Sequence, residues 1–177
     1  MLGQRQFLAG AGAALIAAPI TPALASLGDV RQLAFDNLHT GEKLNIAYWE
    51  QGAYLPDALA VVNRLLRDFR TGQVHAIEPA LLDLLAVMHG KLETASPFSV
   101  ISGYRSPTTN AMLREESDHS GVASKSLHMQ GMAIDIRVAG RPLQGLRDIA
   151  MAQRAGGVGF YPASDFVHVD VGRVRRW

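Results

Sequence analysis

The sequence contains no cysteine and almost no net charge. The absence of cysteine excludes disulfide scaffolds, thiolate zinc sites, iron–sulfur clusters and cysteine nucleophiles. The 17 basic and 16 acidic side chains give a net charge of +1, which offers no electrostatic basis for binding nucleic acid. Any metal site in this chain must therefore be built from histidines and carboxylates.

The chain does have enough apolar sequence for a folded domain. Of its 177 residues, 48% are hydrophobic and 19% are charged. This composition is too apolar for a disordered chain and is sufficient for a sizeable core. The length fits one domain, or one domain preceded by a targeting segment.

The N-terminal segment differs in character from the rest. Arg5 is the one charged residue before Asp29, and an apolar run rich in Ala and Leu extends from Phe7 to Ile20. That run is shorter than the roughly 20 apolar residues that a membrane-spanning helix needs. The tripeptide Ala23-Leu24-Ala25 supplies the small-x-small pattern that a signal peptidase recognises.

These features predict an export signal over residues 1–25 and a mature domain over residues 26–177, which has no membrane span once the signal is removed. An uncleaved anchor and a buried helix are the alternatives. The segment Gln4–Leu8 also resembles a twin-arginine signal whose first arginine has become glutamine. The export route is therefore either Sec or a degenerate twin-arginine pathway.

Hydrophobic periodicity predicts helices mostly before strands. Leu33–Leu38 and Lys43–Trp49 flank a four-residue turn and are typical of a β-hairpin. Apolar residues at helical spacing predict helices over Pro56–Arg70 and Pro79–Leu92. Further predicted elements are a strand over Phe98–Ile101, a short helix through Met112 and Leu113, a polar loop over Glu115–Lys125, a strand over Met132–Val138, a helix over Leu143–Arg154, and strands over Val158–Tyr161 and Phe166–Val171. This order predicts an α+β fold, in which a small antiparallel sheet packs against helices.

Metal-ligating residue types concentrate in the last third of the chain. His128 lies just before a predicted strand, Asp135 lies on it, and His168 lies on a later strand. Two histidines and one carboxylate are the protein ligands of an open catalytic zinc site, whose fourth position holds water. Ala133 shares a strand face with Asp135 and leaves room beside the metal, and Gly131 would ease the tight entry into the strand. The sequence therefore predicts a zinc site on two neighbouring strands.

Several separated motifs resemble the zinc D-Ala-D-Ala metallopeptidases, whose fold is shared with the hedgehog signalling domain. The resemblance is to the YcbK-like branch of murein endopeptidases and covers Leu33–Trp177. Its motifs are Ser102-Gly103-Tyr104-Arg105-Ser106-Pro107, the segment Ser126–Asp135, Gly157-Val158-Gly159-Phe160-Tyr161-Pro162 and Phe166-Val167-His168-Val169-Asp170. Because these motifs agree in order along nearly the whole mature chain, the resemblance is specific.

The resemblance implies roles for individual residues. It makes His128, Asp135 and His168 the ligands of a Zn²⁺ cofactor. It implies that Arg105 binds a substrate carboxylate. The general base of these peptidases lies three residues before the last ligand, a position that Asp165 occupies here, although many relatives have glutamate there.

The positions Asp165, Arg105 and Ser126, the last a further candidate for substrate binding, each have an alternative interpretation. Asp170 competes with Asp165 as the base, because it lies two residues after His168 and therefore on the same strand face. Arg105 could instead form an ion pair with a neighbour such as Asp118. Ser126 either contacts substrate or orients the His128 loop. The remaining histidines lack ligand spacing and are expected to be structural or solvated: His39, His75, His89 and His119.

The resemblance also implies a function, zinc-dependent hydrolysis of the peptide cross-links of peptidoglycan during cell-wall growth or remodelling. The bond cut is expected to join two diaminopimelate residues, or D-Ala and diaminopimelate. Alternatives are a D,D-carboxypeptidase or dipeptidase of the same fold, and a zinc-dependent binding module without turnover. We expect a periplasmic monomer whose partner is the cross-link peptide.

Overall fold

The computed structural model describes residues 30–115 and 123–177. The predicted export signal lies outside the described residues, as do Asp118, His119 and most of the predicted polar loop. Within the described part, none of the helices has the length and apolarity needed to cross a membrane.

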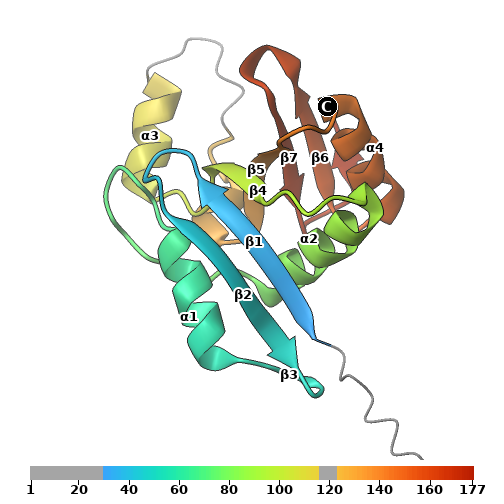
Figure 1. The fold of residues 1–177 in the computed structure, drawn as a ribbon. Coiled ribbons are helices and arrows are strands. Elements are labelled where there is room, and N and C mark those ends of the chain that lie inside the picture. Colours follow the sequence, from blue (N-terminus) through green and yellow to red (C-terminus); the bar gives the residue numbers. More distant parts are fainter. Residues whose placement is uncertain (1–29, 116–122) are drawn as a thin grey trace, which may run out of the picture.

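Helices and strands alternate along the chain, with most helices in the first two thirds (Figure 1). Most predicted elements are confirmed within a few residues. The strands are β1 (Arg31–Asn37), β2 (Lys43–Glu50), β3 (Ala53–Tyr54), β4 (Phe98–Ser102), β5 (Ala133–Val138), β6 (Gly157–Tyr161), β7 (Phe166–Asp170) and β8 (Arg175–Arg176); the helices are α1 (Pro56–Leu65), α2 (Pro79–Leu92), α3 (Pro107–Glu115) and α4 (Leu143–Gln153), with short 3₁₀ turns η1 (Leu127–Gln130) and η2 (Pro162–Ser164).

All eight described strands form one sheet, in the order β3-β2-β1-β4-β5-β7-β6-β8. The predicted α+β class is confirmed, but the expectation of a small, antiparallel sheet is wrong. The pairs β1–β4 and β6–β8 are parallel, and the other pairs are antiparallel. Parallel strands need a long crossover connection, and the chain between β1 and β4 supplies one, because it contains β2, β3, α1 and α2. The two-residue strands β3 and β8 are too short to carry a periodic pattern.

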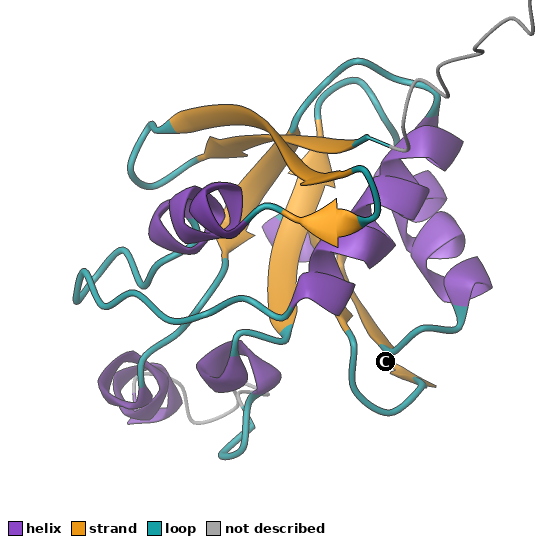
Figure 2. Ribbon diagram, turned by 90° about the horizontal axis from the view of Figure 1, so that it is seen from below, coloured by secondary structure: helices purple, strands orange, loops and turns teal. Residues whose placement is uncertain are grey.

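One face of the sheet packs against helices and forms the core. Figures 1 and 2 show α2 and α4 lying together beside the strands. On β5 the core-facing side chains are Ile134 and Ile136, which are fully buried. Because side chains alternate along a strand, Asp135 points to the opposite face. The apolar core thus fixes which face of β5 carries the polar site.

The first helix ends at Leu65, five residues earlier than predicted. The side chain of Asn37 donates a hydrogen bond to the Leu65 carbonyl. The following turn is organised by the buried Asp68, which accepts hydrogen bonds from the backbone amides of Arg70 and Ser106. A buried carboxylate that binds backbone amides favours a turn over a continued helix, because it supplies the hydrogen bonds that the helix would have made. This turn also holds the loop that follows β4.

Gly131 is required where η1 joins β5. It adopts φ +68°, and a Cβ atom there would overlap the carbonyl oxygen of Ala76. We expect Gly131→Ala to lower the free energy of unfolding by about 3 kcal/mol, because it combines left-handed backbone strain with a backbone clash. Gly140 is the matched control, since it has φ +74° but nothing within 4 Å of the added carbon. Gly140→Ala should cost only about 1 kcal/mol in urea unfolding, and equal losses for both variants would refute the clash.

Candidate metal centre

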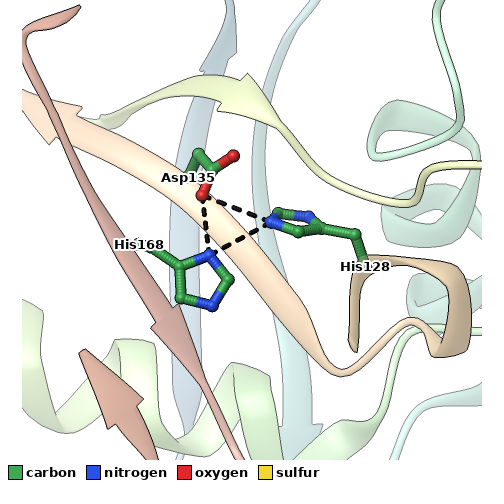
Figure 3. A group of neighbouring side chains, drawn as sticks. All are labelled: His128, Asp135 and His168. Carbon is green, nitrogen blue, oxygen red and sulfur yellow. Dashed lines mark hydrogen bonds and ion pairs between the residues drawn. The ribbon is translucent and has the colours of Figure 1, made fainter. Parts of the chain in front are cut away.

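Three elements bring the predicted ligands together on the polar face of the sheet (Figure 3). Asp135 on β5 and His168 on β7 are directly opposite one another in the antiparallel register. His128 comes from η1, and the side chain of the N-cap residue Ser126 accepts a hydrogen bond from the His128 backbone amide at 3.3 Å. All three ligand side chains are buried. The register of two strands and one capped turn therefore assembles the site.

The ligand atoms form a compact triangle. His128 Nε2 lies 3.1 Å from His168 Nδ1 and 3.2 Å from Asp135 Oδ1, and His168 Nδ1 lies 2.9 Å from the same oxygen. Ligand atoms at about 2.1 Å from a tetrahedral zinc lie about 3.4 Å apart. Among the residues that the structure describes, this is the group of three that could hold a metal ion. The geometry fits a small divalent cation after slight expansion.

The outer nitrogens of both imidazoles determine what the inner ones offer. His128 Nδ1 lies 2.7 Å from the carbonyl oxygen of Gly103, and His168 Nε2 lies 3.1 Å from a carboxylate oxygen of Asp170. Both partners are acceptors, so in the neutral rings these outer nitrogens carry the proton. The inner nitrogens then present lone pairs, which converge with a lone pair of Asp135. Three converging lone pairs are stable together only around a cation or a shared proton, and this convergence is the strongest structural indication of a metal.

The pKa shifts of Asp135 and His168 also indicate a site that attracts a cation. Burial raises the pKa of Asp135, but the neighbouring His128 and His168 outweigh it and hold that pKa well below its usual value. Burial lowers the pKa of His168, but hydrogen bonds with Asp135 and Asp170 outweigh this effect and raise it. A proton on His168 therefore stabilises the metal-free fold at low pH, and this contribution is lost as the pH rises through the raised pKa. A metal ion competes with that proton.

Asp170 lies on the same face of β7 as His168, as strand parity predicts, but it contacts the outer ring nitrogen. It is fully buried and accepts hydrogen bonds from the amides of Gly157 and Gly172 and from the guanidinium of Arg175. Burial raises the pKa of Asp170, but these hydrogen bonds and the one from His168 outweigh it and lower the pKa. Its position suits a carboxylate that orients the imidazole.

We expect Asp170→Asn to weaken zinc affinity by roughly ten- to a hundredfold, because the orienting negative charge behind His168 is lost. Competition against a chromophoric chelator measures the affinity. Asp148→Asn is the matched control, since Asp148 is an exposed aspartate paired with Arg147 on α4. Zinc affinity equal to the wild type in Asp170→Asn would show that Asp170 does not position the ligand.

Asp165 lies at the turn that precedes β7, with φ +54°. Its side chain is 64% exposed and forms an ion pair with Arg137 at 2.7 Å. Arg137 lies two residues after Asp135 on β5, so it shares the polar face of that strand. Of residues 30–115 and 123–177, the carboxylate that lines the pocket at the metal centre is Asp135. Asp165 therefore lies next to the site, turned toward Arg137.

Arg105 and Ser126 both line a pocket of about 170 Å³ that contains the three ligands. The Arg105 side chain is 13% exposed, and its Nη2 lies 3.7 Å from Asp135 Oδ2. Its Nε is buried without a hydrogen-bond partner among the described residues. Its backbone amide donates to the His128 carbonyl, which links the Arg105 loop to η1. A guanidinium with unused donors beside the ligands is suited to bind an anionic group.

The sequence alone does not single out the other pocket residues. Lys125, Arg175, Tyr161, Phe166 and Trp177 also line the pocket. The Tyr161 and Phe166 positions fall within the motifs noted above, but nothing in the sequence places Trp177 beside the ligands. Three other histidines make contacts away from the pocket: His39 stacks on Phe69, His75 stacks on Tyr104, and His89 Nε2 lies 2.9 Å from the Ser96 carbonyl.

Comparison with known proteins agrees with this geometry. The model of the family described as "Peptidoglycan L,D-endopeptidase MepK" (Peptidase_M15_2) matches residues 25–177. The chain is 44% identical to peptidoglycan L,D-endopeptidase MepK of Escherichia coli K12 over 177 residues. This alignment covers 98% of this chain and 96% of that protein. It is 42% identical over 156 residues to probable peptidoglycan L,D-endopeptidase MepK of Haemophilus influenzae, which covers 88% of this chain and 83% of that protein. On this similarity, which extends over nearly the full length of both chains, the protein belongs to the MepK family of peptidases.

Proposed function

We propose that this protein is a zinc-dependent peptidoglycan endopeptidase that hydrolyses peptide cross-links during cell-wall growth or remodelling. The observation that carries the proposal is the convergence of three lone pairs, from His128, Asp135 and His168, in a pocket that also contains Arg105. Family membership supplies the reaction class, and the relatives are named as peptidoglycan L,D-endopeptidases.

His128, Asp135 and His168 would hold the metal, and Asp170 would keep the His168 ring in place. When bound, zinc supplies a Lewis acid that polarises the scissile carbonyl and lowers the pKa of water. The protein must then provide a proton acceptor, a group that binds and orients the substrate, and exclusion of bulk solvent. The burial of all three ligands serves the last requirement.

We assign the proton acceptor to Asp165. It lies three residues before His168, where the resembling peptidases have their base, and it forms an ion pair with Arg137, which is two residues after Asp135 on β5. Rotation of the exposed Asp165 side chain away from Arg137 would let it take a proton from the attacking water and later return it to the leaving amine. Asp170 is the less suitable candidate, because its carboxylate is engaged behind the His168 ring.

The proposed bond is the link between two diaminopimelate residues. The prefix L,D in the names of the relatives describes a bond between an L centre and a D centre. The alternative bond, from D-Ala to the D centre of diaminopimelate, joins two D centres. A D,D-carboxypeptidase or dipeptidase has the same difficulty, so we rank both below the diaminopimelate link.

Arg105 is proposed to bind a carboxylate of the substrate and so to fix which amide lies over the metal. We expect Arg105→Lys to raise KM or to lower kcat by roughly tenfold or more, because lysine retains the charge but loses the planar two-point contact. Zinc content should not change, and elemental analysis checks this. Peptide hydrolysis with unchanged kinetics would identify Arg105 as a structural residue paired with Asp135.

Export to the periplasm by residues 1–25, a monomeric state and the absence of a membrane anchor are also part of the proposal. Peptidoglycan lies outside the cytoplasmic membrane, so an enzyme that acts on it must be exported. Mass spectrometry of the protein recovered from the periplasm tests the cleavage, since removal of the signal predicts a chain that begins at Ser26.

Purified sacculi test the function as a whole. After the treated sacculi are digested with a muramidase, zinc-loaded protein should have increased muropeptide monomers at the expense of cross-linked dimers, and protein treated with a chelator should not. No release by protein that contains zinc would favour the binding module without turnover. Release of D-Ala alone would favour the carboxypeptidase.

A further inference from the structure

The sheet face that carries the ligands continues past the metal centre into an aromatic surface. Successive strands in the order β4-β5-β7-β6-β8 place Arg105 after β4, Asp135 on β5, His168 on β7, Tyr161 on β6 and Trp177 directly after β8. Neighbouring strands are about 4.8 Å apart. A peptide laid across this face from Arg105 would therefore pass over the ligands and then reach the aromatic side chains.

Three rings form this surface, which we call the aromatic wall: Tyr161, Phe166 and Trp177. Tyr161 and Phe166 are directly opposite in the β6–β7 register and stack with ring centroids 4.6 Å apart. Trp177 Nε1 donates a hydrogen bond to Tyr161 Oη at 2.6 Å. The Trp177 ring also lies 5.2 Å from the ring of His168. The wall is thus continuous with one ligand of the metal centre.

The strand beneath the wall has a space shaped for the indole. Gly159 on β6 is directly opposite His168, and a Cβ atom there would lie 2.8 Å from ring carbons of both Trp177 and Tyr161. Such a separation is too short for a real contact, so any larger residue would displace a ring. Trp177 nevertheless remains 50% exposed. A large aromatic side chain that is seated by a glycine and left half exposed in a pocket is well suited to bind a ligand.

Two basic side chains, Arg175 and Lys125, lie beside the aromatic wall. Arg175 lies with its Cζ 4.9 Å from the centre of the Trp177 ring, and its guanidinium also binds Asp170. Lys125 lines the same pocket, is exposed, and has no hydrogen bond or ion pair among the described residues. Apolar rings flanked by positive charge match an aliphatic chain that ends in a carboxylate.

We propose that the aromatic wall binds the aliphatic side chain of the substrate residue that lies across the scissile amide from Arg105, and that Lys125 faces the carboxylate at the end of that chain. This inference rests on the proposed function and specifies its substrate. The matching residue is a diamino acid such as diaminopimelate, whose carbon chain carries a terminal carboxylate. A short side chain such as that of alanine would leave the wall uncovered.

A pair of peptides that differ only at that residue, diaminopimelate or alanine, tests the wall. The wild type should cleave the diaminopimelate peptide with a kcat/KM higher by roughly ten- to a hundredfold, the range expected for a few buried methylenes. Trp177→Ala should bring the ratio close to one, and Trp177→Phe should preserve part of it. An unchanged ratio in folded Trp177→Ala would overturn the proposal, as would equal losses on both peptides.

Two glycine variants separate the wall from general stability. Gly159→Ala should reduce the ratio because it displaces the indole. Gly145→Ala is the matched control, because an added carbon at this exposed position on α4 meets nothing within 4 Å. Its ratio should equal that of the wild type. Reduction of the ratio by both glycine variants would show that selectivity follows stability, which would overturn the proposal.

A binding measurement keeps this test independent of turnover. The chain has two tryptophans, so Trp49→Phe leaves Trp177 as the sole indole reporter. In this variant without metal, the diaminopimelate peptide should shift Trp177 emission to shorter wavelength, and the alanine peptide should require roughly tenfold higher concentration. Absence of cleavage together with this shift would refute the proposed function but support the wall. Cleavage without any shift in emission would support the proposed function and refute binding by the aromatic wall.

Discussion

Asp165→Asn is expected to retain its zinc and to lose hydrolytic turnover by roughly two to four orders of magnitude, the usual contribution of a positioned general base. The substitution preserves shape and removes the proton acceptor. It also removes the ion pair with Arg137, which is exposed and therefore contributes little to stability. Zinc stoichiometry and the rate of muropeptide cleavage measure the two effects separately.

Asp148→Asn, an exposed aspartate on α4, serves as the control for this experiment and should cleave like the wild type. Asp170→Asn completes the comparison, because its loss of activity should follow its weakened zinc affinity and recover when zinc is raised. Near wild-type cleavage by Asp165→Asn, together with an inactive Asp170→Asn that keeps its zinc, would require the two assignments to be exchanged.

His128→Ala is expected to reduce bound zinc from about one per chain to nearly none and to abolish hydrolysis, because the remaining two ligands cannot hold the ion tightly. The fold should persist, since α2 and α4 bury their apolar faces against the sheet without any contribution from His128. In the wild type, zinc should leave below roughly pH 5–6 as His168 takes up a proton. His168 sets the sign of this effect, because its raised pKa makes the proton a stronger competitor as the pH falls.

His39→Ala is the matched control for this zinc measurement. His39 is exposed and stacks on Phe69 in the turn after β1, away from the pocket. The His39→Ala variant should keep both its zinc and its hydrolytic activity. Elemental analysis after dialysis at neutral pH distinguishes the variants, and a full equivalent of zinc in His128→Ala would exclude His128 as a ligand.

Local pattern predicted much of this fold because the relevant information lies in short segments. The helix from Pro79 to Leu92 and the strand through Asp135 follow directly from spacing and alternation. Spacing alone did not identify the three ligands. Asp135 and His168 are 33 positions apart, and they could be joined only through the resemblance and the chemistry of zinc. Gly131 fits the role that its size suggested, because no larger residue has space at the entry to β5.

Long-range pairing explains what the sequence could not reveal. The parallel pairing of β1 with β4 depends on how two intervening helices pack, and no segment of the chain encodes it alone. The early end of α1 depends on Asp68 reaching the amide of Ser106, 38 residues away. Trp177 reaches the pocket because β8 pairs with β6 and because Gly159 leaves space for the indole. The side chain of Asp165 turns toward Arg137, which lies on another strand.

A defined cross-linked dimer gives the most direct test of the central claim, that the His128, Asp135 and His168 centre hydrolyses peptidoglycan cross-links. Two muropeptides joined through their diaminopimelate residues are incubated with wild-type protein that contains one equivalent of zinc, and the products are identified by mass spectrometry. We expect two monomers that together gain one water, with no such products from His128→Ala. An intact dimer after prolonged incubation with zinc-loaded, folded wild type would contradict it.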